Sequence, residues 1–130
     1  MDMKAATIAG LYALFMGVAM MGMWSMFIAT DQIPEFEDEA VRISFHLAGE
    51  FLTAVALIVG GIAMIRARPW AFNLFLVAMG MLTYTLIVSP GYYGQQEDYG
   101  FVGMFAVFLA TSTFLIAYAI RNDGAFRSIC

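Results

Sequence analysis

Four long apolar segments, separated by short polar ones, make up most of this chain. Each has about the 20 residues that an α-helix needs to cross the hydrocarbon core of a membrane. Short connections favour antiparallel neighbours. The pattern therefore predicts an all-α integral membrane four-helix bundle with up-down-up-down topology, in a single transmembrane domain over residues 1–130. The expected spans lie at about residues 5–30, 43–65, 69–89 and 100–120.

The polar connections carry helix-start and turn signals. Pro34 suits the first turn of a helix, and the acids that follow it lie where the positive end of the helix dipole favours anions. We expect the second helix to begin in water near Pro34 and to enter the membrane near Ile43. Cations and a proline at residues 66–69 end it, and Ser-Pro-Gly at residues 89–91 predicts the next turn.

The composition excludes several classes of protein. Hydrophobic residues make up 62% of the 130 residues, far more than in an ordinary soluble domain. The net charge of -4 argues against a nucleic-acid partner, because binding nucleic acid needs a basic face. The single cysteine, Cys130, permits no internal disulfide.

The basic residues predict the orientation of the chain. Five of the six Lys and Arg residues fall at the N-terminus, between the second and third spans, or at the C-terminus. These three places share one side of a four-span membrane protein. The positive-inside rule then leaves both termini cytoplasmic and the acidic connections outside. The five residues are Lys4, Arg66, Arg68, Arg121 and Arg127.

Two stripes of residues follow the first span. Ala9, Ala13 and Gly17 recur every four residues and form a flat strip for close contact with another helix, including one from a second copy in a homodimer. A methionine stripe lies on the same span, and thioethers on a membrane helix can bind Cu(I). Eleven methionines spread through the whole chain instead favour packing. The stripe consists of Met16, Met20 and Met23.

The only histidine lies on the second span, four residues before the only carboxylate within an apolar segment. At 100° per residue His46, Glu50 and Thr53 share one narrow face, which continues toward the acidic connection. A charged glutamate facing lipid at this depth would cost at least about 2.5 kcal/mol. We therefore expect Glu50 to face the interior of the bundle, to stay protonated, or both.

A small-ligand pocket is the leading functional hypothesis. Counting inward from the outer ends of the other spans places Trp24, Thr83 and Tyr84 near the depth of Glu50. Apolar walls with a few convergent polar groups are typical of such a pocket. We expect it to bind a small hydrophobic or amphiphilic molecule, for example a membrane lipid, with His46 and Glu50 as polar partners. The predicted ligand-binding residues are Trp24, His46, Glu50, Thr53, Thr83 and Tyr84.

Three alternatives stay open. The polar pair could simply fasten helices, at about 0.6 kcal/mol for each hydrogen bond, in an accessory or structural subunit that packs against a membrane-protein partner. Glu50 could instead serve proton-linked transport, or an isomerase-like enzyme whose catalytic residues are unknown. We expect no metal and no cofactor, because the spacing of His46 and Glu50 supplies two ligands where catalytic zinc takes three.

The segment HLAGE on the second of four spans resembles the His-x-x-x-Glu motif of EXPERA-type membrane proteins, which include sterol isomerases and related ligand-binding receptors. The chain is also similar to small four-span prokaryotic proteins of the DoxX-like kind, above all in RPWAFNLFLVAMGMLTYTLIVSPGYYGQ and GFVGMFAVF. The resemblance implies a four-helix fold in a prokaryotic plasma membrane. It also implies a pocket for a sterol-like or cationic ligand beside His46 and Glu50.

Overall fold

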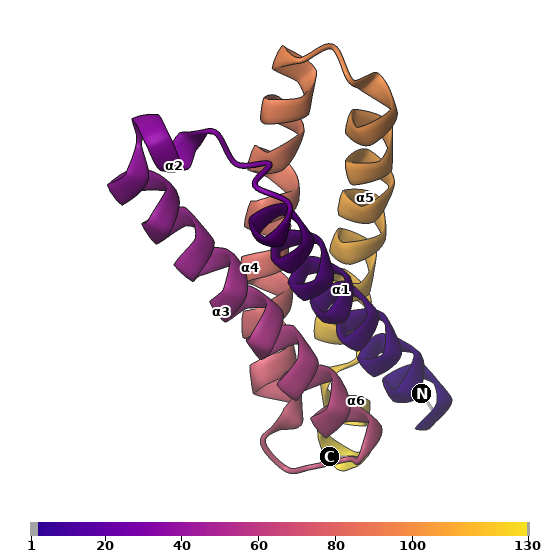
Figure 1. Ribbon diagram of the computed structural model, residues 1–130. Helices are drawn as coiled ribbons and strands as arrows, with labels where there is room; N and C mark the ends of the chain where they lie inside the picture. Colours follow the sequence, from indigo (N-terminus) through magenta and orange to yellow (C-terminus); the bar gives the residue numbers. More distant parts are fainter. Residues whose placement is uncertain (1–2, 130) are drawn as a thin grey trace.

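The computed structural model describes residues 3–129, and the regular elements in this range are helices. Four of the helices are long and apolar enough to cross a membrane, which confirms the predicted all-α class with four long apolar helices. They are α1 (Met3–Ala29), α3 (Ala40–Ile65), α4 (Ala71–Gln95) and α5 (Tyr99–Arg121). Two short helices, α2 (Glu35–Asp38) and α6 (Asp123–Ile129), complete the chain (Figure 1).

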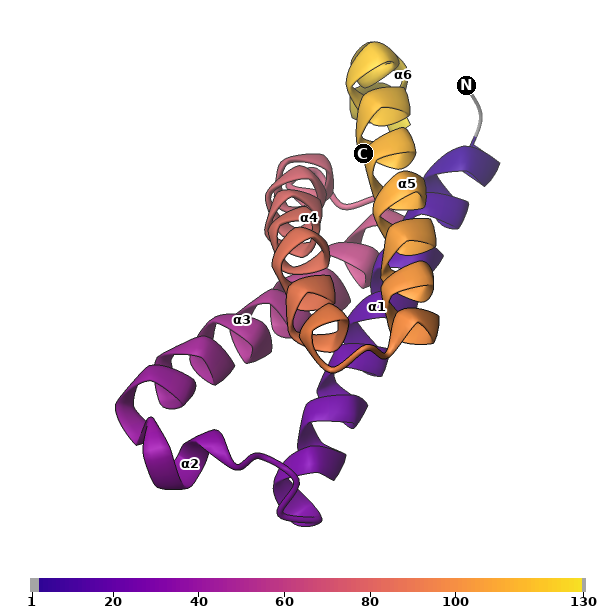
Figure 2. The ribbon, with the colours of Figure 1, turned by 90° about the horizontal axis from the view of Figure 1, so that it is seen from above.

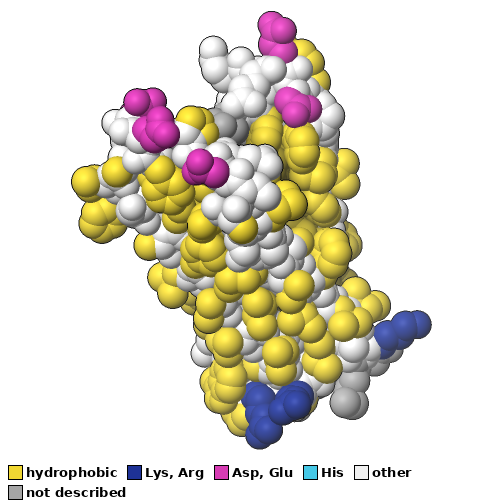
Figure 3. Space-filling view, in the orientation of Figure 1, with side chains coloured by type: hydrophobic (Ala, Val, Ile, Leu, Met, Phe, Trp, Pro, Cys, Tyr) yellow, Lys and Arg dark blue, Asp and Glu magenta, His cyan; other side chains and the backbone are white. Residues whose placement is uncertain are grey.

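The two ends of the bundle differ in charge. Figure 1 places both chain ends, α6 and the α3–α4 connection at one end, and α2 and the α4–α5 connection at the other. On the face shown in Figure 3, Asp and Glu side chains gather at the end that carries α2, and Lys and Arg side chains at the opposite end. A wide hydrophobic band separates them. We call these ends the acidic end and the basic end.

Helices α1 and α3 form the most extensive helix pair, and small residues bring their backbones together. A Cβ atom added to Gly10 would lie 2.7 Å from the carbonyl oxygen of Gly61, and one added to Gly17 would lie 2.7 Å from the carbonyl oxygen of Ala54. Side chains at these positions would keep the helices apart. The predicted small-residue strip thus includes a contact with α3 of the same chain. We call Gly10, Gly17, Ala54 and Gly61 the glycine seam.

Toward the acidic end, α1 and α3 lie farther apart. Figures 1 and 2 show the two helices diverging beyond the seam, with α2 and its connection joining their far ends. Helix α3 also packs on α4, and α4 packs on α5. The core between these helices is apolar and includes Met16 and Met20, in agreement with the packing interpretation of the methionine stripe.

The last element closes the basic end of the bundle. Phe126 of α6 is buried, and its ring centroid lies 5.4 Å from that of Phe72 on α4. The Arg127 guanidinium lies 4.8 Å from the centroid of the same Phe72 ring, a favourable cation–π distance. These contacts hold α6 against α4.

A polar contact also ties α5 to α1. The Tyr12 hydroxyl lies 2.7 Å from the Ser112 hydroxyl and donates a hydrogen bond of 3.2 Å to the Phe108 carbonyl oxygen. Ser112 is fully buried. Interhelical hydrogen bonds of this kind help to hold membrane helices together.

The turn predicted at residues 89–91 is wrong, because α4 continues through Pro90 to Gln95. Proline breaks helices in water, but a membrane helix tolerates it where neighbouring groups compensate the missing hydrogen bond. Here the last turns of α4 are held by α5: the Tyr93 ring stacks on those of Phe101 and Phe105, at 4.7 and 5.6 Å between centroids. The chain turns later, at Glu97, whose φ is 59°.

The second helix predicted to begin near Pro34 is divided in two. Helix α2 ends at Asp38, Glu39 has the non-helical angles φ -137° and ψ 51°, and α3 begins at Ala40. The connection before α2 is anchored by Ile33, which is buried. The break changes the direction of the chain, so that α2 and its connection join the separated ends of α1 and α3.

Candidate functional site

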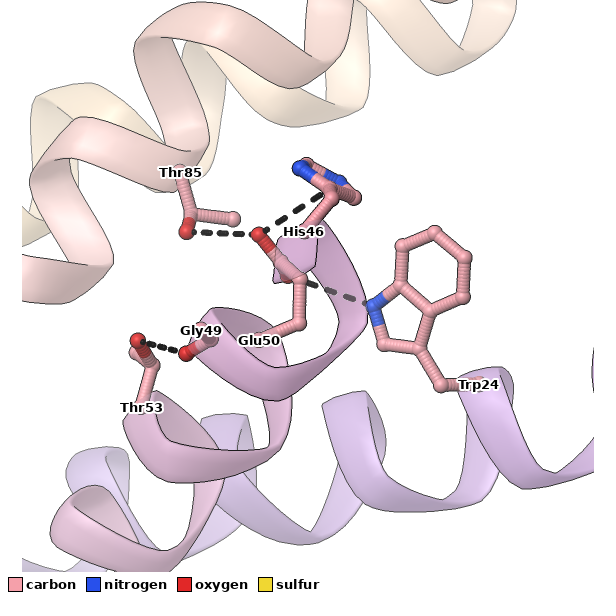
Figure 4. Close-up of polar contacts among 6 residues, drawn as sticks. All are labelled: Trp24, His46, Gly49, Glu50, Thr53 and Thr85. Carbon is pink, nitrogen blue, oxygen red and sulfur yellow. Dashed lines mark hydrogen bonds and ion pairs between the residues drawn. The ribbon is translucent and has the colours of Figure 1, made fainter. Parts of the chain in front are cut away.

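Glu50 lies at the centre of a polar cluster that joins three helices (Figure 4). Trp24 on α1 donates a hydrogen bond from Nε1 to Glu50 Oε2 at 3.2 Å. Thr85 on α4 donates from Oγ1 to Glu50 Oε1 at 3.0 Å. Glu50 is only 5% exposed, so the expectation that it faces the bundle interior is confirmed. We call Trp24, Glu50 and Thr85 the Glu50 cluster.

His46 lies one helical turn from Glu50, toward the acidic end. Its Nε2 atom is 3.9 Å from Glu50 Oε1, which is too long for a hydrogen bond and forms an ion pair only when His46 is protonated. The imidazole also meets the Trp24 ring edge to face, with centroids 5.8 Å apart. Its side chain is 43% exposed. His46 is therefore an accessible polar group directly beside a buried one.

A cavity of about 700 Å³ lies at the acidic end, next to the Glu50 cluster. This volume falls within the usual range for small-molecule sites. Its lining comes from α1, α2, α3, α4 and residues at their ends. We call it the acidic-end pocket. Its lining residues are the aromatic Trp24, Phe27, Tyr84 and Tyr93, the aliphatic Ile33, Ile43 and Val88, and the polar Gln32, Glu35, Glu39, Arg42, His46, Ser89 and Gln96.

The structure divides the predicted site residues into separate groups. Trp24, His46 and Tyr84 come from three helices and line the same pocket. Tyr84 is 67% exposed, so the pocket reaches the lateral surface of the bundle there. Glu50 does not line the pocket but reaches it through the hydrogen bond to Trp24.

The two predicted threonines lie outside the pocket lining. Thr53 and Thr83 each donate a hydrogen bond of 2.8 Å to a backbone carbonyl one turn earlier in their own helices. Sequence reasoning missed Thr85, which holds Glu50 instead. The helical period offered a signal, because Thr85 lies three residues after the buried Leu82 and beside the buried Leu86.

The charged and polar groups here do not form an obvious metal centre. Within residues 3–129, no three His, Cys, Asp or Glu side chains come together where they could hold a metal ion. What the site offers chemically is a large partly apolar surface, one accessible imidazole, and carboxylates near the opening. Such groups can bind and orient an organic molecule by burial, hydrogen bonding and charge.

The chain thus has four helices that are long and apolar enough to cross a membrane, with a pocket at one end. The chain belongs to the family described as a domain of unknown function, DUF8058, whose sequence model matches residues 3–128. No curated protein and no solved structure matches the chain. The resemblance to EXPERA-type and DoxX-like proteins stays a prediction, and the functional argument rests on the site.

Proposed function

We propose that this protein binds a small hydrophobic or amphiphilic molecule in the acidic-end pocket. The observation that carries the proposal is the convergence of Trp24, His46 and Tyr84 from three helices on one cavity of about 700 Å³. His46 offers the ligand a hydrogen bond from the pocket wall. Glu50 acts on the pocket indirectly, because it orients Trp24 by a hydrogen bond and lies beside His46.

We further propose that the helices cross the membrane up-down-up-down, with both termini cytoplasmic and the pocket in the outer half. The separation of basic and acidic ends supports this orientation through the positive-inside rule. In intact cells, a membrane-impermeant maleimide should not label Cys130, the only cysteine. Labelling should appear after the membrane is permeabilised. As a control, Gln96→Cys in a Cys130→Ser background should react from outside; the reverse pattern would contradict the orientation.

Ligand binding can be read from Trp24, since the chain has only two tryptophans and Trp70→Phe leaves Trp24 as the reporter. In nanodiscs, a brominated long-chain alcohol should quench Trp24 emission saturably because the ring lines the pocket. Val88→Phe should weaken this binding about tenfold by filling space, a loss of about 1.4 kcal/mol. The matched control is Ile87→Phe, because Ile87 is exposed and lies outside the pocket lining.

The Trp24→Phe variant supplies the second control for this experiment. It leaves Trp70, an exposed residue at the start of α4, as the reporter. Quenching of Trp70 should rise without saturation, as expected for bromine dissolved in the surrounding lipid. Equal behaviour of Trp24 and Trp70, or equal affinities of the Val88 and Ile87 variants, would contradict binding in the pocket.

A structural role for the polar pair is the second candidate, and one specific observation favours it. Both carboxylate oxygens of Glu50 already accept hydrogen bonds from other helices. The Glu50 carboxylate thus holds α1, α3 and α4 together, a role that suits an accessory or structural subunit. Binding measurements on Val88→Phe and Ile87→Phe separate the two candidates, because neither residue belongs to the Glu50 cluster.

A further inference from the structure

We propose that a second cavity, at the basic end, binds the phosphate head group of an anionic phospholipid. The cavity has a volume of about 420 Å³ and lies where the chain passes from α3 to α4. The inference requires that the long helices cross a membrane, but it is independent of the acidic-end pocket. We call this cavity the basic-end pocket. Its lining residues are Val59, Ile62, Ala63, Arg66, Arg68 and Trp70.

The basic-end pocket is positively charged. Arg66 and Arg68 are both exposed, and neither forms an ion pair with an Asp or Glu side chain of residues 3–129. None of the residues that line the pocket is acidic. Each guanidinium group can donate two parallel hydrogen bonds to phosphate oxygens. A phosphate in this pocket would therefore gain two charged partners without displacing an existing one.

The backbone at the end of α3 brings the two arginines to the same pocket. The Arg68 N–H donates a hydrogen bond of 3.0 Å to the Ala63 carbonyl oxygen. The Ala67 N–H donates one of 3.2 Å to the Met64 carbonyl oxygen, and Ala67 has a left-handed φ of 53°. These two bonds form the Schellman motif, which ends a helix with one left-handed residue. Because they join backbone atoms, replacing either arginine side chain should leave the turn in place.

An apolar surface continues from the arginines along α3. Val59, Ile62 and Arg66 are three and four residues apart, so they share one face of the helix and its end. Val59 and Ile62 are 42% and 39% exposed, and they offer apolar area to a neighbouring molecule. From Arg66 to Val59 this face is about 10 Å long, at 1.5 Å per residue. An acyl chain can cover it while the head group binds the arginines, whereas a free phosphate would leave it uncovered.

Trp70 completes the pocket and reports on its occupant. Its ring lines the cavity and is 51% exposed at the start of α4. Tryptophan is enriched at the membrane surface, where one part of its ring meets lipid and another meets water. In the Trp24→Phe protein Trp70 is the only tryptophan, so bromine atoms on a bound lipid chain should quench its emission.

Two brominated lipids that differ only in the head group test the inference. In nanodiscs of phosphatidylcholine, brominated phosphatidylglycerol should quench Trp70 saturably. It should do so at a mole fraction about tenfold lower than brominated phosphatidylcholine requires for the same quenching. Arg66→Gln and Arg68→Gln should each reduce this preference to about threefold or less. The matched control is Arg121→Gln, which removes the same charge from an exposed residue outside the pocket lining.

Three outcomes would overturn the inference. The first is equal quenching by the two brominated lipids. The second is an equal loss of preference in Arg121→Gln and in the two pocket variants, since the preference would then reflect the charge of the whole basic end. The third is displacement of the brominated lipid by excess soluble glycerol phosphate, which would show that the acyl chain contributes nothing. All three leave the proposed function standing, because binding in the acidic-end pocket is read from Trp24.

Discussion

Replacing Gly61 with alanine should lower the free energy of unfolding by about 1–3 kcal/mol, the usual range for overpacked positions. A Cβ atom there would lie 2.6 Å from the carbonyl oxygen of Gly10 and 2.7 Å from the backbone nitrogen of Leu14. Both are backbone atoms, so no side-chain rotation relieves the clash and α1 must move away from α3. Reversible unfolding in mixed micelles, with an increasing mole fraction of dodecyl sulfate and followed by circular dichroism, measures the loss.

The neighbouring glycine provides a matched control. A Cβ atom added to Gly60 would meet its nearest atoms on α4 at 3.5 Å, an ordinary contact, and one added to Gly49 would meet nothing within 4 Å. Alanine also has the higher helix propensity. Gly60→Ala and Gly49→Ala should therefore be as stable as the unchanged protein or slightly more stable. If Gly61→Ala and Gly60→Ala unfolded at the same mole fraction of dodecyl sulfate, the close approach of α1 and α3 would be refuted.

Glu50→Ala should lower the free energy of unfolding by about 1–3 kcal/mol, because it leaves the Trp24 N–H and the Thr85 hydroxyl without their acceptor. Glu50→Gln should cost less, since its amide oxygen still accepts one of the two hydrogen bonds while its NH₂ group faces a donor. The same unfolding titration measures both variants. Near-native stability of Glu50→Ala would argue against a structural role for this side chain.

Threonine variants of α4 test whether the loss comes from the Glu50 cluster. Thr85→Val should be destabilised, whereas Thr83→Val should change little because its hydroxyl bonds only its own helix. The effects of Glu50→Ala and Thr85→Val should not add in the double variant, since both remove the same hydrogen bond. Additive losses would mean that Glu50 and Thr85 do not interact.

The spans were predictable because lipid imposes one strong condition, a run of about 20 apolar residues in a helix. The residues at which the helices begin and end were harder to predict. Pro90 has the local chemistry of a turn, yet stacking of Tyr93 on α5 keeps that part of α4 helical. The break at Glu39 was missed because acids after Pro34 suit a helix start equally well in a short helix and a long one. At Pro90, therefore, a contact with the next helix decides.

For the candidate site, the sequence predicted how deep the residues lie along their helices. It did not predict how each helix is rotated about its own axis. Counting residues inward placed Trp24 and Tyr84 near the depth of Glu50, and in the structure both line one pocket together with His46. Counting could not separate Thr83 from Thr85, which lie two residues apart on α4 but point to different partners. That distinction depends on how α4 is rotated against α3. Local sequence carries this information only through the period of its buried residues.

The glycine seam has a consequence for the width of the acidic-end pocket. The seam holds α1 against α3 in the half of the bundle nearer the basic end. The crossing angle of the two helices at the seam therefore sets how far apart their ends lie at the acidic end. Trp24 lies seven residues beyond Gly17, about 10 Å along α1. The width of the pocket thus depends on residues that do not line it. Bulk added at the seam would change which molecules fit, without altering a single lining side chain.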